Sequence, residues 1–328
     1  MQSPKKNITY LLLMFTMASQ SQVYKDNFAH TFSIVARDPA TGEMAVGVQS
    51  HWFSVGTIVA WGKSGVGVVA TQSFVNPAYG PNGLQLMENG ITAKQAMDDL
   101  IAKDAGREVR QVAMLDNKGN VHAFTGEKCI ASASHFVGDN FSVQANMMLN
   151  DEVVPAMAKA YLKNAGLPLA ERVLATLKAA QEAGGDIRGQ QSAALIVVGG
   201  KKVAEPWKEK LVDLRVDDHN TPIKELERLL RVHRAYDYMN KGDLAVEHGD
   251  MKNAMEAYAE AQKLFPENLE MKYWTAVTMA NNGQLEKSLP LFKEIFVADP
   301  NWRELTRRLP KVGLLTLSQE ELLKVLQL

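Results

Sequence analysis

The sequence contains a single cysteine, Cys129, in 328 residues, so no disulfide can form within one chain. Cysteine usage therefore neither requires nor excludes an oxidising compartment. Cys129 comes just after a predicted strand, and free cysteines are usually buried. We therefore interpret it as a small, buried or half-buried residue rather than a nucleophile.

Other signals of chemistry are also absent. The formal net charge is −1, which provides no basic surplus for binding nucleic acid. None of the seven histidines stands in a metal-ligand pair such as His-x-His, so we predict no metal site. Gly62-Lys63-Ser64 lacks the upstream glycine of a phosphate-binding loop, because position 57 is threonine, and we interpret it as a hairpin turn. There is no Gly-x-Ser-x-Gly motif, and we predict no cofactor.

No apolar run reaches the roughly 20 residues that cross a bilayer. The run Ile8–Ala18 follows two lysines and precedes small and polar residues, which is the layout of a secretory signal peptide. We predict a signal peptide over residues 1–21 and a linker or propeptide over 22–30. The mature protein would be exported, to the periplasm or the extracellular space, with no membrane attachment. A partly apolar, frayed N-terminus is the alternative.

Residues 31–217 alternate short apolar stretches with turn formers. The predicted strands are 31–37, 44–50, 57–61, 66–73, 110–115, 121–125, 141–148, 191–198 and 212–216. The predicted helices are 83–89, 93–103, 151–162 and 169–183, and Thr92 is the predicted N-terminal cap of the second. The first four strands read as two successive hairpins of one meander. Strands grouped in this way, with paired helices between them, favour an α+β fold of two stacked antiparallel sheets covered by helices, a four-layer αββα sandwich.

Residues 222–328 are predicted to be helical, with an internal repeat. Gly249 and Gly283 are 34 residues apart, as are Pro266 and Pro300, and this is the period of tetratricopeptide repeats. We predict about two repeats over residues 235–302. Their small and aromatic positions are Tyr238, Gly242, Ala254, Tyr258, Ala261, Ala276 and Phe292. Two repeats are few for independent stability. The tail is therefore expected to dock a protein partner, or to pack on the preceding domain or a second copy of the chain.

Small polar residues recur at the ends of the apolar strands. They are Gln49, Ser50, Gln72, Ser73, Gln144, Asn146, Gln191 and Ser192. A buried amide or hydroxyl must find a partner, because leaving it unpaired costs free energy. If the strands align, these residues could line a pocket for an amide, peptide or amino-acid-like ligand. Strand ends exposed to water would also favour polar residues, so both interpretations stay open.

Several ordered blocks resemble one known family. They are residues 31–38 (TFSIVARD), 70–72 (ATQ), 76–81 (NPAYGP), 126–129 (GEKC), 141–147 (FSVQANM) and 184–195 (GGDIRGQQSAAL). Together they resemble the domain of unknown function 1028 family, which is regarded as N-terminal-nucleophile-hydrolase-like. The resemblance spans about residues 31–216 and implies the same αββα sandwich. Within the blocks, Asn76, Tyr79 and Arg188 join the polar strand-end residues as candidate ligand-binding residues.

The fold class implied by this resemblance uses the first residue of the mature chain as nucleophile and its own α-amine as base. Thr31, at the head of the first predicted strand, takes that place by analogy, and Ser33 is the alternative. Thirty residues precede Thr31, so a second cleavage, of the His30–Thr31 bond, is needed after removal of the signal peptide. The sequence thus supports two hypotheses: an exported amidohydrolase acting on peptides or small amides, and a non-catalytic ligand-binding sandwich whose tail binds protein.

Overall fold

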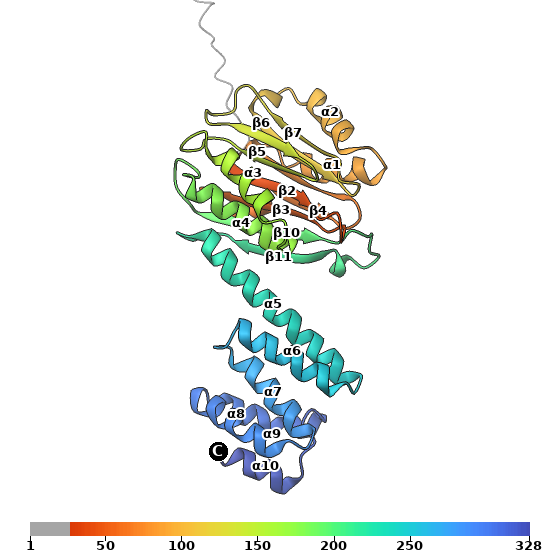
Figure 1. Ribbon diagram of the computed structural model, residues 1–328, viewed down its shortest axis with the longest axis vertical. Helices are drawn as coiled ribbons and strands as arrows, with labels where there is room; N and C mark the ends of the chain where they lie inside the picture. The colour runs from red at the N-terminus through yellow and green to blue at the C-terminus, as the bar shows by residue number, and fades with distance from the viewer. Residues whose placement is uncertain (1–26) are drawn as a thin grey trace, which may run out of the picture.

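The computed structural model describes residues 27–328. The expected signal peptide and residues 22–26 of the expected linker lie outside the described residues. The described chain is a mixed α+β protein with two antiparallel sheets, followed by a C-terminal helical region. In Figure 1 the sheets and their helices form one body, and the long helix α5 leads from it to the C-terminal helices.

The first sheet has five strands, and β5 lies at its centre. Along one path the order is β1-β5-β6-β7, and β4 also pairs with β5. The strands are β1 (Asn27–Ala29), β4 (Ala60–Lys63), β5 (Gly67–Val75), β6 (Arg110–Asp116) and β7 (Val121–Thr125). Helices α1 (Tyr79–Glu88) and α2 (Ala93–Lys103) contact this sheet. The predicted cap Thr92 begins α2 with a capping box, accepting from the backbone of Gln95.

The second sheet has six strands in the order β11-β10-β3-β2-β9-β8. The strands are β2 (Thr31–Arg37), β3 (Met44–Ser50), β8 (Ser134–Gly138), β9 (Phe141–Ala145), β10 (Ser192–Val198) and β11 (Lys210–Val216). Helices α3 (Val153–Lys163) and α4 (Leu169–Glu182) contact it, and β2 and β3 contact β5 of the first sheet. The layers therefore run helix pair, sheet, sheet, helix pair, as the strand order predicts.

Successive side chains of the second sheet point to opposite faces, so the core has two parts, one on each side of this sheet. Val35, Val46 and Ile196 face the space between the sheets, whereas Ile34, Ala45 and Leu195 face α3 and α4. All six are buried, because the central strands β2, β3 and β10 are covered on both faces. The predicted meander is wrong: the hairpin β2–β3 lies in one sheet and the hairpin β4–β5 in the other. The intervening residues 51–59 form turns and a short 3-10 helix, Val55–Thr57, and they carry the chain from one sheet to the other.

The C-terminal region contains six α-helices. They are α5 (Pro222–Glu247), α6 (Met251–Leu264), α7 (Leu269–Asn281), α8 (Leu285–Ala298), α9 (Asn301–Arg308) and α10 (Gln319–Leu326). Helices α5 and α6 pack together, as do α7 and α8. Gly249 and Gly283 both have positive φ and follow α5 and α7, so the 34-residue period relates equivalent turns of two helical hairpins.

Close packing within the first hairpin depends on Gly242. A Cβ atom at this position would lie 2.3 Å from the ring of Tyr258, which is buried against α5. The small residues Ala254 and Ala261 are buried in the same cluster, and Ala276 and Phe292 are buried in the cluster of the second hairpin. Small and aromatic positions of the repeat therefore lie at helix contacts.

Candidate active site

Thr31 lies between the two sheets, at the end of β2. In the sheet it is paired with Ser50 of β3, which in turn is paired with Ser192 of β10. Its side chain is fully buried, and its hydroxyl donates to the carbonyl oxygen of Ala29 at 2.7 Å. In the described chain Thr31 continues from His30, so its nitrogen belongs to a peptide bond and cannot act as a base.

A network of buried amides surrounds this strand end. Ser33 donates to Oε1 of Gln72 at 2.7 Å and accepts from Nε2 of Gln144 at 2.6 Å. Gln72 donates to Oε1 of Gln111 at 2.7 Å, and Asn146 donates to the same oxygen at 2.9 Å. All five side chains are fully buried. Because each amide has partners, the network avoids the cost of unpaired buried polar groups.

The network is also joined to the backbone of Thr31. Nε2 of Gln72 lies 3.2 Å from the carbonyl oxygen of Thr31, and the backbone nitrogen of Asn146 donates to that oxygen at 3.1 Å. The hydroxyl of Ser33 is engaged on both sides by glutamines, so Thr31 is the better placed of the two predicted nucleophiles.

The carbonyl oxygen of His30 accepts two side-chain hydrogen bonds. Oγ of Ser50 donates to it at 2.5 Å, and Nη2 of Arg188 donates to it at 2.9 Å. This carbonyl belongs to the peptide bond that precedes Thr31. Two donors on one carbonyl oxygen, one of them charged, are the arrangement that stabilises negative charge when a nucleophile adds to the carbon.

Asp186 fixes the guanidinium of Arg188. Its buried carboxylate accepts from Nε and Nη2 of Arg188 at 3.0 and 2.7 Å, and from the backbone nitrogen of His51 at 3.1 Å. Such a two-point contact orients the planar guanidinium as well as holding it. The negative charge of Asp186 also compensates the positive charge of Arg188, whose side chain is mostly buried.

The His30 side chain is enclosed as well. Its Nδ1 lies 2.8 Å from Oδ1 of Asn146, and its ring meets the ring of Phe74 edge to face at 5.5 Å. Because Nδ2 of Asn146 donates to Gln111, Oδ1 is the accepting atom, and Nδ1 of His30 therefore carries the proton. Burial lowers the pKa of His30, against the hydrogen bond from its ring to Asn146.

Five predicted site residues lie apart from this network. Gln49 points to the helix-covered face of its sheet, where neither amide atom has a partner among the described residues. The hydroxyl of Tyr79 donates to Asp104 at 3.0 Å, and Asn76 accepts from the backbone of Ala78 in the turn before α1. The remaining two are neighbours in the chain, and neither bonds to the network: Gln191 donates to Asp218, and Ser192 donates to the backbone of Trp52.

Sequence reasoning missed three members of the site. Gln111 interrupts the apolar strand β6, and a buried glutamine within such a strand is a signal that could have been followed. His30 and Asp186 stand outside regular strands, so no periodicity pointed to them. Cys129 is half-buried as predicted, and burial raises the pKa of its thiol, which disfavours the reactive thiolate.

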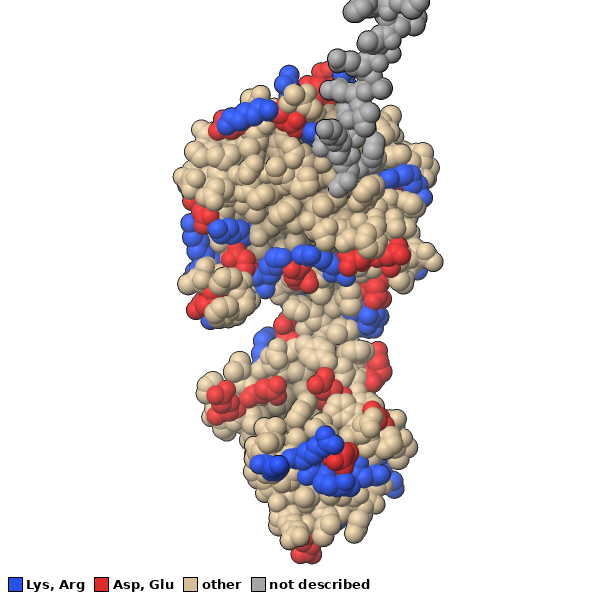
Figure 2. All heavy atoms as spheres, turned by 180° about the vertical axis from the view of Figure 1, so that it is seen from behind, with Lys and Arg blue, Asp and Glu red and all other residues tan. Residues whose placement is uncertain are grey.

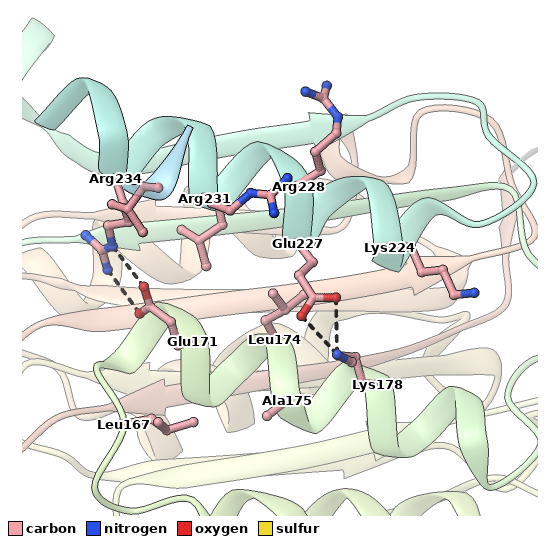
Figure 3. A pocket seen from close by; sticks show the side chains of 12 residues that line it. Leu167, Glu171, Leu174, Ala175, Lys178, Lys224, Glu227, Arg228, Arg231 and Arg234 are labelled. Atoms are coloured by element: carbon pink, nitrogen blue, oxygen red, sulfur yellow. Dashed lines mark hydrogen bonds and ion pairs between the residues drawn. The ribbon is translucent and has the colours of Figure 1, made fainter. Parts of the chain in front are cut away.

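A separate hollow of about 680 Å³ lies between α4 and α5, away from Thr31. Figure 3 shows two ion pairs across it, Arg234 with Glu171 and Lys178 with Glu227. Its floor includes Leu174 and Leu230. Its lining contains neither Thr31 nor any residue of the buried amide network, so this hollow is distinct from the candidate active site.

Among the described residues, the face of the two-sheet body that is seen from behind carries no continuous patch of one charge (Figure 2). Figure 2 shows a broad, mostly uncharged surface there, with basic and acidic side chains gathered along its edges. Among residues 27–328, no three His, Cys, Asp or Glu side chains are grouped so as to hold a metal ion. Within the same range, no helix combines the length and apolarity needed to cross a membrane.

Comparison with known proteins places the chain in a protein family. The model of a family of unknown function (DUF1028) matches residues 31–226, which is more than half of the chain. The chain belongs to this family. A crystal structure of protein SPO2555 from Silicibacter pomeroyi, which carries the same family model, is similar, with 31% sequence identity and a TM-score of 0.56. The similarity covers 62% of this chain and 88% of that chain. No curated protein matches the chain.

Proposed function

We propose that the protein is an exported amidohydrolase of the N-terminal-nucleophile type, with Thr31 as nucleophile, acting on peptide or small amide bonds. The observation that carries the proposal is the pair of donors, Ser50 and Arg188, on the carbonyl oxygen of His30. The carbonyl of the bond that must break to release Thr31 is thus already polarised. The order of layers, with a helix pair outside each of two antiparallel sheets, is compatible with an N-terminal-nucleophile hydrolase fold and supports the same proposal.

Release of Thr31 would proceed at this carbonyl. The Thr31 hydroxyl adds to the carbonyl carbon of His30, while Ser50 and Arg188 stabilise the oxyanion. The C–N bond breaks, and the hydroxyl proton passes to the nitrogen, which becomes the α-amine of Thr31. Water then hydrolyses the ester between Thr31 and His30. The products are a chain that begins at Thr31 and a severed segment that ends at His30.

Turnover would repeat this chemistry on an external amide. The free α-amine of Thr31, with an ordinary pKa near 8, accepts the hydroxyl proton as the oxygen attacks the amide carbonyl. The leaving nitrogen takes that proton, and water cleaves the acyl ester. Ser50 and Arg188 serve the second reaction as they served the first, because both reactions place an oxyanion at the same position beside Thr31.

Two further assignments belong to this proposal. Residues 1–21 are a signal peptide, which brings the protein to the periplasm or extracellular space, and cleavage after His30 removes the rest of the leader. The helical hairpins α5–α6 and α7–α8 are tetratricopeptide-like repeats. Their 34-residue spacing and the contact between Gly242 and Tyr258 support that assignment.

The second candidate is a non-catalytic sandwich that binds a small amide or peptide-like ligand, with a helical tail that docks a protein. One observation favours it: β1 pairs with β5, and Ala29 and His30, the two residues before Thr31, are buried. In this case Thr31 would remain an internal residue, and the amide network would be structural. A second copy of the chain is a further candidate partner for the tail.

The N-terminus of the mature protein separates the two candidates. We would purify the full chain from the exported fraction and determine its intact mass and N-terminal sequence. The amidohydrolase proposal expects a chain that begins at Thr31, an uncut and inactive Thr31→Ala variant, and a cut and active Thr31→Ser variant. Thr57→Ala, an exposed threonine, is the matched control and should behave like the unaltered chain. A purified chain that begins upstream of Thr31 and hydrolyses no amide would support the binding protein instead.

A further inference from the structure

The segment before Thr31 lies along the edge of a sheet as an added strand. Asn27, Phe28 and Ala29 of β1 pair antiparallel with residues 75, 74 and 73 of β5. The next strand on this edge is β4, which pairs with residues 67–70 of β5. An extended peptide that pairs with an exposed strand edge gains backbone hydrogen bonds whatever its sequence. After cleavage at Thr31, β1 would no longer be tethered to the sandwich, and residues 73–75 of β5 could pair with another extended chain.

After this added strand comes His30, whose side chain and carbonyl oxygen each make defined contacts. The His30 ring meets Phe74 edge to face and donates from Nδ1 to Asn146, and both His30 and Asn146 are buried. The His30 carbonyl is held by Ser50 and Arg188. Backbone pairing, a side-chain pocket and a polarised carbonyl are the three parts of a peptide acyl subsite.

We propose that β1 and His30 mark the acyl subsite for the substrate: an extended peptide of at least four residues whose acyl residue carries a planar ring with an N–H donor, histidine above all. The inference rests on the proposed function and specifies its substrate class. The severed segment that ends at His30 is then the first product to occupy the subsite. Its new carboxylate would face Arg188, so it binds as a product inhibitor.

Release of Thr31 and turnover of an external peptide pass through the same kind of intermediate. Release of Thr31 forms an ester between the Thr31 oxygen and the His30 acyl group. Turnover of an external peptide with histidine at the acyl position forms the same kind of ester, by attack of the Thr31 oxygen on that histidine carbonyl and departure of the external amine. A site that stabilises the ester of the chain's own segment therefore also accommodates the ester of an external peptide with the same acyl residues.

Asn146 provides the selectivity. Its Nδ2 is committed to Gln111, so Oδ1 must face the ring as an acceptor. A ligand with alanine at this position would leave that oxygen unpaired in a buried site and would lose the contact with Phe74, and a phenylalanine ring would keep only the stacking. Burial lowers the pKa of His30, which fits recognition of a neutral imidazole.

The test uses the full chain after it has matured to Thr31 and has been washed free of the severed segment. The substrates are coumarylamides of acetyl-Asn-Phe-Ala-His, of acetyl-Asn-Phe-Ala-Ala and of acetyl-His alone. We expect kcat/KM for the histidine tetrapeptide to exceed each of the others by about tenfold or more. The Phe74→Ala variant should lower the ratio of histidine to alanine substrate. The variant of the exposed residue Phe53, Phe53→Ala, should leave that ratio unchanged.

The outcomes separate this inference from the proposed function. Hydrolysis of all three substrates at equal kcat/KM would overturn the subsite and leave the amidohydrolase intact. Calorimetric binding of the product acid, acetyl-Asn-Phe-Ala-His, together with no hydrolysis of any of the three coumarylamides, would support the subsite and overturn the hydrolase. If the full chain is never cut, the same peptide is titrated onto a full chain carrying His30→Asp, in which an unpaired carboxylate expels the chain's own segment. Binding there supports the subsite, and absence of binding refutes it.

Discussion

Nη2 of Arg188 lies 2.9 Å from the carbonyl oxygen of His30, although the two residues are 158 positions apart in the chain. The contact joins the loop after α4 to the peptide bond before Thr31. Asp186 holds the guanidinium in place, and Ser50 donates to the same oxygen from β3. Burying a charged group such as the Arg188 guanidinium costs free energy. Its position on the His30 carbonyl oxygen would let it stabilise negative charge there when the Thr31 hydroxyl attacks.

Arg188→Ala should slow release of Thr31 by about 100-fold, because loss of one oxyanion donor typically costs that much in rate. The measurement is the fraction of intact chain over time, by mass spectrometry of pulse-labelled protein. Arg228→Ala, which removes an exposed arginine paired with Glu225, is the control and should leave the rate unchanged. Equal cleavage rates in the two variants would show that Arg188 has no part in the reaction.

Gln111→Ala should lower the free energy of unfolding by about 3 kcal/mol. It removes the shared acceptor of the amide nitrogens of Gln72 and Asn146 and leaves them only longer contacts, such as those with the carbonyl oxygen of Thr31. A buried donor that loses its partner costs about 1–3 kcal/mol. Urea denaturation of the uncut Thr31→Ala chain measures the change. Gln85→Ala, at an exposed position of α1, should change stability by less than about 0.5 kcal/mol. A similar small effect of Gln111→Ala would mean that water replaces the network.

Docking of residues 27–30 should weaken as the pH falls below about 6.5, the ordinary pKa of histidine. Burial lowers the pKa of docked His30, so the docked segment binds fewer protons than the released one, and acid favours release. The nearby charge of Arg188 acts in the same direction, and that of Asp186 opposes it. Hydrogen exchange at residues 73–75 of the Thr31→Ala chain, at pH 7.5 and 5.5, measures docking.

The control for this pH effect is His30→Phe in the same uncut chain. Phenylalanine fills the ring site but does not titrate, so the difference in exchange between the two pH values, corrected for intrinsic rates, should disappear. If the difference persists in the phenylalanine variant, another group such as His122 or His135 causes it, since burial lowers the pKa of both.

Gly242→Ala should destabilise the helical region by about 1–3 kcal/mol. Alanine normally stabilises a helix interior relative to glycine, but here its Cβ would lie 2.3 Å from the Tyr258 ring, and overpacking reverses the sign. The melting temperature of the helical transition measures the effect. Gly166→Ala is the matched control, because a Cβ at position 166 meets nothing within 4 Å. An unchanged or higher melting temperature for Gly242→Ala would show that α5 and α6 can move apart with little loss of stability.

Local pattern alone predicted much of the fold. The bounds of β2 and β3 agree with the apolar runs 31–37 and 44–50, and Thr92 caps α2 as predicted. Period-2 alternation and capping chemistry depend on neighbours in the chain, so the sequence records them directly. The 34-residue spacing of Gly249 and Gly283 likewise marks equivalent turns, because each must adopt positive φ.

The sequence also determined that polar residues gather at strand ends, but not which of them meet. Gln49 and Ser50 are adjacent, and because alternate residues of a strand face opposite sides, only Ser50 reaches the His30 carbonyl. The three residues of β1 are too few to show a period, so their pairing with β5 came only from the folded chain. The contact of Arg188 with His30 is likewise tertiary, because no local rule relates residues 158 positions apart. The sequence by itself determined the strands, the helices and the stock of amides, and the tertiary structure decided which of them surround Thr31.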